Sequence, residues 1–279
     1  MYSSVGAWAT GGSLNTARRE LGGAGTQTAG LAFGGGPPEV AISEEYNGSA
    51  WAEGDDLNTA RRMLAGAGTQ TAGLAFGGSG PPPAIEETET YDGSSWTEVG
   101  DLNTGRRELT GCGIQTAALA IDGQVTTSLA IVELYNGTSW TEVGDTNTAR
   151  QEQPGGFGIT TAAIVAGGTI PPVTDNVESY DGSSWTEINN TNAVRTNLTA
   201  AGLQTAGMIF GNYPNDAGLT ELFDGTSWTE VADLSTARNG LAGAGTLNSA
   251  LAMGGANPGN VDATEEWDMD ASVETVAFD

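Results

Sequence analysis

Short apolar runs alternate with polar turns along the whole chain, and residues 61–99 show one complete unit of this pattern. RRMLAGAGT has the composition of a glycine-rich strand, AGLAFGG of a short apolar strand, IEETETY of an alternating strand and SWTEV of a fourth strand. The turn signals GTQT, SGPPP and Asp92-Gly93 separate these segments. No segment has helical periodicity of useful length, so the pattern predicts four short antiparallel strands per unit.

The unit occurs six times, with a period of 43 to 45 residues. Three markers keep the same phase throughout: a tryptophan, an arginine ten residues later, and a second aromatic residue. The tryptophans are Trp8, Trp51, Trp96, Trp140, Trp185 and Trp228, and the second aromatics are Tyr46, Tyr91, Tyr135, Tyr180, Phe223 and Trp267. The arginines are Arg18, Arg61, Arg106, Arg150, Arg195 and Arg238. A phase kept six times identifies a repeat protein.

A single four-stranded sheet cannot bury both of its faces, whereas six sheets stacked around an axis bury them against one another. The sequence therefore predicts an all-β, six-bladed β-propeller with four antiparallel strands per blade. It forms one domain over residues 1–279, with a blade starting near each of the six arginines. The segment around Trp8 has no preceding strands of its own and keeps the spacing to Arg18. We expect it to close the ring as the fourth strand of blade six, the alternative being residues 272–278.

The order of markers resembles the kelch repeat: a Gly-Gly pair, then Glu-x-Tyr, then Trp, then Arg. The glycine pair is present at 34–35, 77–78, 167–168 and 254–255, and is weakened to Asp122-Gly123 and Gly211-Asn212 in two units. WD repeats have a similar period, but the Gly-His and Trp-Asp signatures are missing from their places. The segments NTAR, GTQTAGLAFGG and NGTSWTEV look most similar to kelch-like repeats of marine phage virion proteins.

Strand order defines two faces of the predicted ring. The loops that enter the first and third strands share one face, and they are irregular at 36–40, 79–84, 124–129, 169–175, 212–218 and 256–262. Variable loops on a rigid scaffold commonly carry recognition. The candidate ligand-binding residues on this face are Arg19, Arg62, Arg107, Pro81, Pro82, Val125, Pro171, Pro172, Tyr213 and Asn257.

A glutamate stands two residues before each second aromatic: Glu44, Glu89, Glu133, Glu178, Glu221 and Glu265. We expect each of the six arginines to cross the glycine pair and form a partly buried ion pair with the glutamate of its blade. The kelch resemblance implies an alternative, in which arginines at this point in the repeat bind acidic peptides at the channel mouth.

Composition narrows the chemistry. The chain has nine arginines, no lysine and no histidine, against 35 aspartates and glutamates, so its net charge is −26. Such a surface repels nucleic acids and anionic lipid heads, so we expect no nucleic-acid partner and no membrane insertion. The lone Cys112 excludes an intrachain disulfide, and no apolar run or signal segment suggests a membrane span or classical secretion.

The same composition argues against catalysis. Without Lys or His there is no imidazole base or Schiff-base lysine, and the copper oxidase among kelch enzymes needs histidines. The DGSSW segments fail the Asp-box pattern of sialidases. A carboxylate pair would suffice for an acidic glycoside hydrolase, but nothing distinguishes one. Calcium at Asp55, Asp56, Asp101, Asp145 or Asp233 is the alternative to turn capping. We expect no enzyme activity, no cofactor and no metal.

Two non-enzymatic functions stay open at this point, with the acidic glycoside hydrolase as the enzymatic alternative. The first is a phage virion structural or adhesion protein of a tail, fibre or capsid surface, whose partners are other virion proteins or a host surface protein or glycan. The second is a soluble extracellular or cytoplasmic kelch module that binds a protein or glycan.

Overall fold

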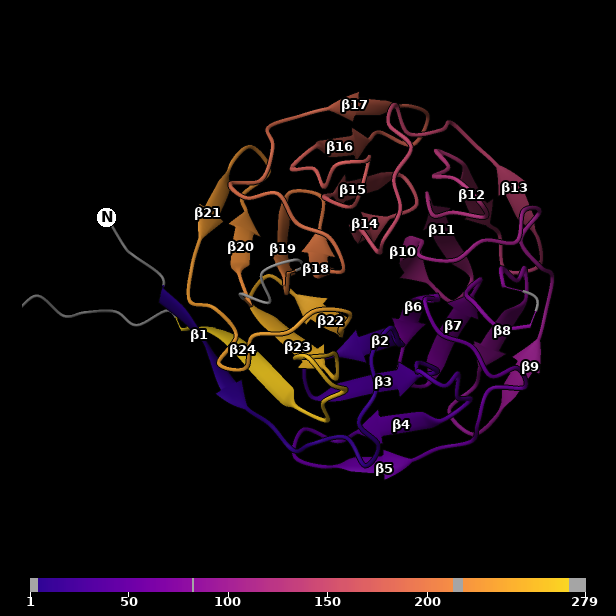
Figure 1. The fold of residues 1–279 in the computed structure, drawn as a ribbon, viewed down its shortest axis with the longest axis vertical. Helices are drawn as coiled ribbons and strands as arrows, with labels where there is room; N and C mark the ends of the chain where they lie inside the picture. The colour runs from indigo at the N-terminus through magenta and orange to yellow at the C-terminus, as the bar shows by residue number, and fades with distance from the viewer. Residues whose placement is uncertain (1–4, 82, 213–217, 271–279) are drawn as a thin grey trace, which may run out of the picture.

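The computed structural model of the protein describes residues 5–81, 83–212 and 218–270. Its regular structure in these ranges is 24 β-strands in six four-stranded antiparallel sheets, arranged as blades around a central axis (Figure 1). This confirms the predicted six-bladed, all-β propeller. Within the same ranges, no helix is long and apolar enough to cross a membrane.

Each blade runs from an innermost first strand to an outermost fourth strand. The first strands are β2 (Gly22–Thr26), β6 (Ala65–Thr69), β10 (Thr110–Ile114), β14 (Gly155–Ile159), β18 (Thr199–Leu203) and β22 (Ala242–Thr246). The second strands are β3 (Ala29–Phe33), β7 (Ala72–Phe76), β11 (Ala117–Ile121), β15 (Ala162–Ala166), β19 (Ala206–Phe210) and β23 (Ser249–Met253).

The third strands are β4 (Ser43–Tyr46), β8 (Thr88–Tyr91), β12 (Val132–Tyr135), β16 (Val177–Tyr180), β20 (Thr220–Phe223) and β24 (Thr264–Asp270). The fourth strands are β5 (Trp51–Glu53), β9 (Trp96–Glu98), β13 (Trp140–Glu142), β17 (Trp185–Glu187), β21 (Trp228–Glu230) and β1 (Val5–Thr10). We call the face that holds the loops into the first and third strands the upper face. The lower face holds the turns after the first and third strands.

Glycines crowd the first strands because these strands converge on the axis. A Cβ atom on Gly66 would lie 2.6 Å from the carbonyl oxygen of Gly23 in the neighbouring blade. A Cβ atom on Gly111 would lie 2.4 Å from the Phe76 ring. Larger residues at these positions would push the blades apart, so the inner radius of the ring depends on glycine.

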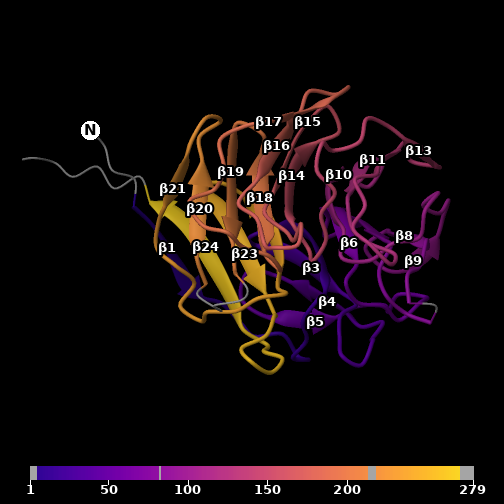
Figure 2. The same cartoon turned by 45° about the horizontal axis from the view of Figure 1, so that its top comes forward.

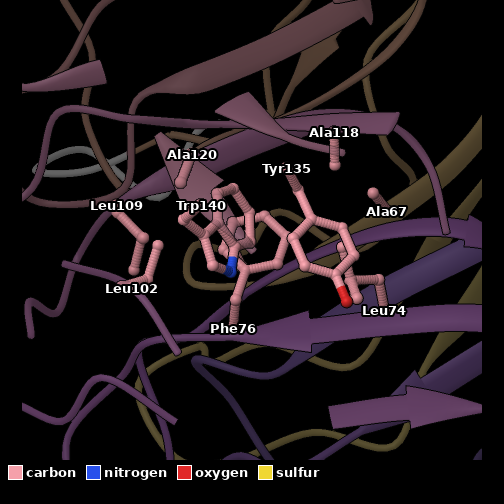
Figure 3. Close-up of a cluster of buried hydrophobic side chains, with 10 residues drawn as sticks. Ala67, Leu74, Phe76, Leu102, Leu109, Ala118, Ala120, Tyr135 and Trp140 are labelled. Carbon is pink, nitrogen blue, oxygen red and sulfur yellow. The ribbon is translucent and has the colours of Figure 1, made fainter. Parts of the chain in front are cut away.

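The apolar core lies between blades. In one cluster, Leu74 and Phe76 of blade two pack against Tyr135 and Trp140 of blade three (Figure 3). The Phe76 and Trp140 ring centroids are 4.9 Å apart. The outer aromatics therefore fill the widening gap between blades, as expected of wedge-shaped packing.

The N-terminal strand closes the ring. β1 pairs antiparallel with β24, and Trp8 lies opposite Trp267. The Trp8 indole N–H donates to Thr220 Oγ1 of blade five at 3.0 Å. Both views show β1 at the outer edge beside β24 (Figure 1 and Figure 2). The prediction that the Trp8 segment completes blade six is confirmed, and the competing segment 272–278 lies outside the described residues.

Candidate functional site

The six blade arginines and the six glutamates form one ion pair per blade, with all twelve side chains at most 1% exposed. The pairs are Arg18–Glu44, Arg61–Glu89, Arg106–Glu133, Arg150–Glu178, Arg195–Glu221 and Arg238–Glu265. These arginines lie inside the blades rather than around the channel mouth, so they are not presented to a peptide there.

Each arginine crosses its own blade over the end of the second strand. The Arg61 guanidinium donates to the Gly77 carbonyl at 3.3 Å, to the Glu87 carbonyl at 2.5 Å and to Glu89 Oε1 at 3.0 Å. Gly77 has a φ of 63°, and a Cβ atom there would lie 2.7 Å from the Arg106 carbonyl oxygen of the next blade. The glycine pair thus leaves the space that the arginine and the next blade occupy.

The short segment before each arginine belongs to the same network, which the spacing of residues along the chain did not predict. It is Asn-Thr in four blades, Asn192-Ala193 in blade five and Ser235-Thr236 in blade six. Glu89 accepts hydrogen bonds from the Asn58 backbone N–H at 2.7 Å and from its side-chain amide at 2.8 Å. The Asn58 amide also donates to the Trp96 carbonyl at 3.1 Å. The glutamate therefore holds an arginine and a loop at once, and we call this arrangement the clasp.

Burial affects the ionisation of the clasp arginines. Burial lowers the pKa of Arg61 and Arg238, opposed by the charges of Glu89 and Glu265 respectively. The pKa of Arg195 falls to about 10, again mainly by burial. Arginine remains cationic at neutral pH even so, and each buried cation needs its carboxylate.

Backbone hydrogen bonds join neighbouring blades around the axis. The Gly35 N–H donates to the Arg61 carbonyl of the next blade at 2.9 Å, and the Gly255 N–H donates to the Arg18 carbonyl at the same distance. A second set of bonds runs closer to the axis, where Met63 N–H donates to the Glu20 carbonyl at 2.7 Å. Because the bonds continue from blade six into blade one, the upper end of the ring is rigidly framed.

The second arginines stand at the upper face, with side chains 31%, 24% and 28% exposed for Arg19, Arg62 and Arg107. Each lies within 4 Å of a carboxylate. Arg62 contacts Glu20 Oε2 at 2.5 Å and Glu39 Oε1 at 2.9 Å. The Arg19 and Arg107 Nε atoms lie 3.6 Å from Glu20 and 3.8 Å from Glu108 respectively. The structure thus places three cations at the mouth together with their own counter-charges.

These contacts set the charge state of the mouth. Burial lowers the pKa of Arg62, but its hydrogen bonds with Glu39 and Glu20 outweigh that effect and the pKa is raised overall. The Glu108 pKa is also raised, mainly by burial, against the opposing charge of Arg107. Any anion at Arg62 would compete with two carboxylates already present.

Blade three departs from the repeat at Asp122, which replaces the first glycine of the pair at a φ of 58°. Its carboxylate lies 3.1 Å from Arg150 Nε and accepts from Thr146 Oγ1 at 2.5 Å. Burial raises the Asp122 pKa to about 7, with Arg150 and Thr146 opposing the shift. The residue that weakens the glycine pair in the sequence, Asp122, therefore gives Arg150 a second carboxylate in addition to Glu178.

The irregular loops share one anchor although their lengths differ. In five blades, an N–H at the end of the loop donates to the carbonyl of the second residue of the glycine pair, at 2.8 to 3.1 Å. The closing pairs are Val40–Gly35, Ile85–Gly78, Leu129–Gly123, Thr174–Gly168 and Val261–Gly255. The corresponding loop of blade five includes residues 213–217, which are not among those described. The loop tips thus differ between blades, while the hydrogen bond that closes each of these five loops is the same.

The predicted loop residues occupy these tips. Pro81, Val125, Pro171, Pro172 and Asn257 are exposed on the upper face, while Pro82 and Tyr213 lie outside the described residues. Arg62 and Arg107 reach the loops of the preceding blades, the latter by donating to the Pro83 carbonyl at 3.3 Å. The upper face therefore brings second arginines and loop residues into one surface.

The channel along the axis holds two small cavities, of about 70 Å³ toward the upper end and about 120 Å³ toward the lower end. Glycine and alanine residues of the first strands form much of both walls, and the upper cavity also has Gln153 and the leucines that directly precede five of these strands. Two of the acids before the first strands bind the start of a third strand, in place of the turn capping that the sequence predicted for them: Asp101 accepts from Thr88 N–H at 3.1 Å, and Asp233 from Thr220 N–H at 3.2 Å. Among the described residues, no group of three or more acidic, cysteine or histidine side chains is placed to hold a metal.

Six four-stranded blades around a channel define the molecule as a six-bladed β-propeller. Among solved structures it is similar to that titled "Structure of YjhT", with a TM-score of 0.76 over 92% of this chain and 96% of the other, at 12% sequence identity. At that identity the similarity shows the fold alone. No protein-family model and no curated protein sequence matches the chain.

Proposed function

We propose that this propeller is a non-enzymatic recognition scaffold of kelch-like design, which binds its partner through the irregular loops of the upper face. The observation that carries the proposal is the shared loop anchor, which fixes both ends of loops whose tips differ between blades. Fixed frames with variable tips present side chains at little entropic cost on binding.

The use made of the repeated residues supports this assignment. The six buried arginines, the six glutamates and the glycine pairs serve the blades themselves, as the clasps show. The exposed side chains of the loop tips take no part in these ion pairs, and they lie on the same face as Arg19, Arg62 and Arg107. The two axial cavities have no carboxylate in their walls, so they offer nothing to a glycoside hydrolase mechanism.

We further propose a place on a phage virion, as a tail, fibre or capsid-surface component whose loops contact another virion protein or a host surface protein or glycan. The similarity of the repeated segments to kelch-like virion repeats and the lysine-free acidic composition support this location. Mass spectrometry of purified virions, together with the genes that flank this one, tests it. Absence of the chain from virions that encode it would contradict the location while leaving the scaffold role open.

Loop replacement tests the recognition role. We would replace residues 124–129, and separately 169–175, by glycine-serine segments of equal length, and screen the variants against a glycan array and host surface proteins. The matched control is Asp92→Asn in a hairpin of the lower face. Binding that falls at least tenfold in the loop variants and not in the control supports the proposal. Equal binding by all variants, or no ligand for the wild type, would contradict it.

A further inference from the structure

Three aliphatic side chains break the symmetry of the lower face. Ile114, Ile159 and Leu203 are 55%, 47% and 55% exposed, and each is the last residue of a first strand. They belong to three consecutive blades, three, four and five. The equivalent residues of the other three blades are threonines, namely Thr26, Thr69 and Thr246.

The three residues form an arc around the lower mouth of the channel, which we call the aliphatic arc. Each follows a glycine that lines the lower cavity, Gly113, Gly158 or Gly202. The first strands of blades three, four and five are neighbours around this cavity, whose wall also includes Cys112, Phe157 and Ala201. The three residues therefore stand on adjacent strands along one half of the rim, and exposed apolar side chains grouped in this way mark interaction surfaces.

The charges around the arc have one sign. All nine arginines precede first strands and so belong to the upper face, and the chain has no lysine. The lower face carries exposed carboxylates at the tips of the hairpins, Asp92, Asp181 and Asp224. Hydrogen bonds from the Ser184 and Ser183 backbone and from the Ser183 hydroxyl lower the Asp181 pKa to about 2, which keeps this carboxylate ionised at neutral pH.

These carboxylates are close to the arc. The hairpin glycines Gly182 and Gly225 lie against the turns that follow Ile159 and Leu203, because a Cβ atom on either would come within 3.5 Å of Thr161 or Thr205. Asp181 and Asp224 directly precede these glycines. In blades four and five the lower face is thus apolar at its centre and acidic at its edge, while the hairpin of blade three has Asn136 at the equivalent place.

We propose that the aliphatic arc is a second docking surface, which binds a partner protein segment that combines aliphatic side chains with lysine or arginine. The aliphatic residues of the partner would cover the arc, and its cations would face Asp181 and Asp224. A second copy of this chain fits poorly, because two acidic lower faces from chains of net charge −26 would repel each other.

The test uses the full chain and a synthetic 15-residue amphipathic peptide of leucine and lysine, labelled for fluorescence anisotropy. The test variant is Ile114→Thr/Ile159→Thr/Leu203→Thr, which gives blades three to five the residue that the other blades already have at this position. The matched control is Val125→Thr/Val194→Thr, which removes two exposed aliphatics of the upper face. Circular dichroism establishes that all variants are folded.

We expect the triple variant to bind the peptide at least tenfold more weakly than the wild type, and the control variant to bind within twofold of it. Raising the salt concentration should weaken wild-type binding, and a peptide with glutamate in place of lysine should not bind. Equal binding by the triple variant and the wild type, or no binding by the wild type, would overturn the proposal. Self-association of the wild type that the triple variant abolishes would also overturn it, in favour of a second copy as the occupant.

Discussion

Removing one clasp carboxylate should destabilise the whole ring, and Glu89→Gln is the sharpest way to do it. Glu89 is 1% exposed and faces four donors: the Asn58 backbone and side chain, the Thr59 N–H and the Arg61 guanidinium. Glutamine has nearly the same shape, so the substitution leaves no cavity. Its amide offers one acceptor oxygen where the carboxylate offers two, and it carries no charge.

The expected cost follows from these contacts. The buried Arg61 cation loses its counter-charge, which typically costs about 3–5 kcal/mol when one partner of a buried pair is removed. Two of the four donors would face an NH2 group instead of an oxygen and would stay buried without an acceptor. The range of about 3–5 kcal/mol already includes the cost of these unsatisfied donors. We therefore expect the free energy of unfolding to fall by about 3–5 kcal/mol.

Urea unfolding followed by tryptophan fluorescence measures the change, since Trp96 is buried beside this clasp. The matched control is Glu98→Gln, which lies directly opposite Glu89 on the neighbouring strand but is exposed. The control should change the free energy by less than about 0.5 kcal/mol.

A double-mutant cycle with Arg61→Met isolates the pair itself. We expect the double variant to be less destabilised than the sum of the two single variants by about 2 kcal/mol, because removal of both charges leaves no unpaired one. A loss below about 1 kcal/mol for Glu89→Gln, or equal losses for Glu89→Gln and Glu98→Gln, would refute the clasp as a stabilising element.

Three further substitutions test other parts of the structure. The pKa of Asp122 is raised from 3.8 to about 7 in the folded protein, so the stability that its protonated form contributes is complete below pH 4 and is lost as the pH rises to about 7. Asp122→Asn should therefore be as stable as the wild type at pH 4 and up to about 4 kcal/mol more stable at pH 8. Parallel urea titrations at the two pH values measure the difference. Tyr91 donates to Glu45 of the preceding blade at 2.6 Å, whereas the Tyr135 hydroxyl has no partner and its preceding blade has Thr90 at the position equivalent to Glu45. Thr90→Glu should therefore supply the missing acceptor and stabilise the fold by about 1 kcal/mol, and a gain that survives Tyr135→Phe would contradict this. Asn58→Ala should cost about 1–2 kcal/mol in the same assay through the loss of two side-chain hydrogen bonds, and no change would contradict its place in the clasp.

The fold was predictable because the markers recur in phase. Tryptophan, arginine and aromatic positions at a constant period predict equivalent wedges, and the Trp8-to-Arg18 spacing indicates which terminus closes the ring. The partners of the six arginines followed from similar reasoning, because each blade offers one glutamate across a glycine pair.

Other features depend on geometry that spacing does not reveal. The Asn58 bonds to Glu89 depend on how a loop folds back onto its own blade. The contact between Arg62 and Glu39 joins loops of different blades. Asp122 looked like a lost glycine, and only the position of Thr146 and Arg150 shows it as a buried carboxylate. The exposure of Ile114 and its two counterparts likewise needs the structure, since apolar strand ends are usually buried.

The propeller fold depends most directly on ring closure by β1, and a disulfide cross-link between β1 and β24 measures it. Ala7 lies opposite Asp268 and both are exposed, so Ala7→Cys/Asp268→Cys in a Cys112→Ala background should form an intramolecular disulfide on mild oxidation. The cross-linked ring should unfold at a higher urea concentration than its reduced form. The control Ala7→Cys/Asp224→Cys should stay reduced. Failure of the first pair to cross-link, or equal cross-linking of the control, would contradict a ring closed by the N-terminal strand.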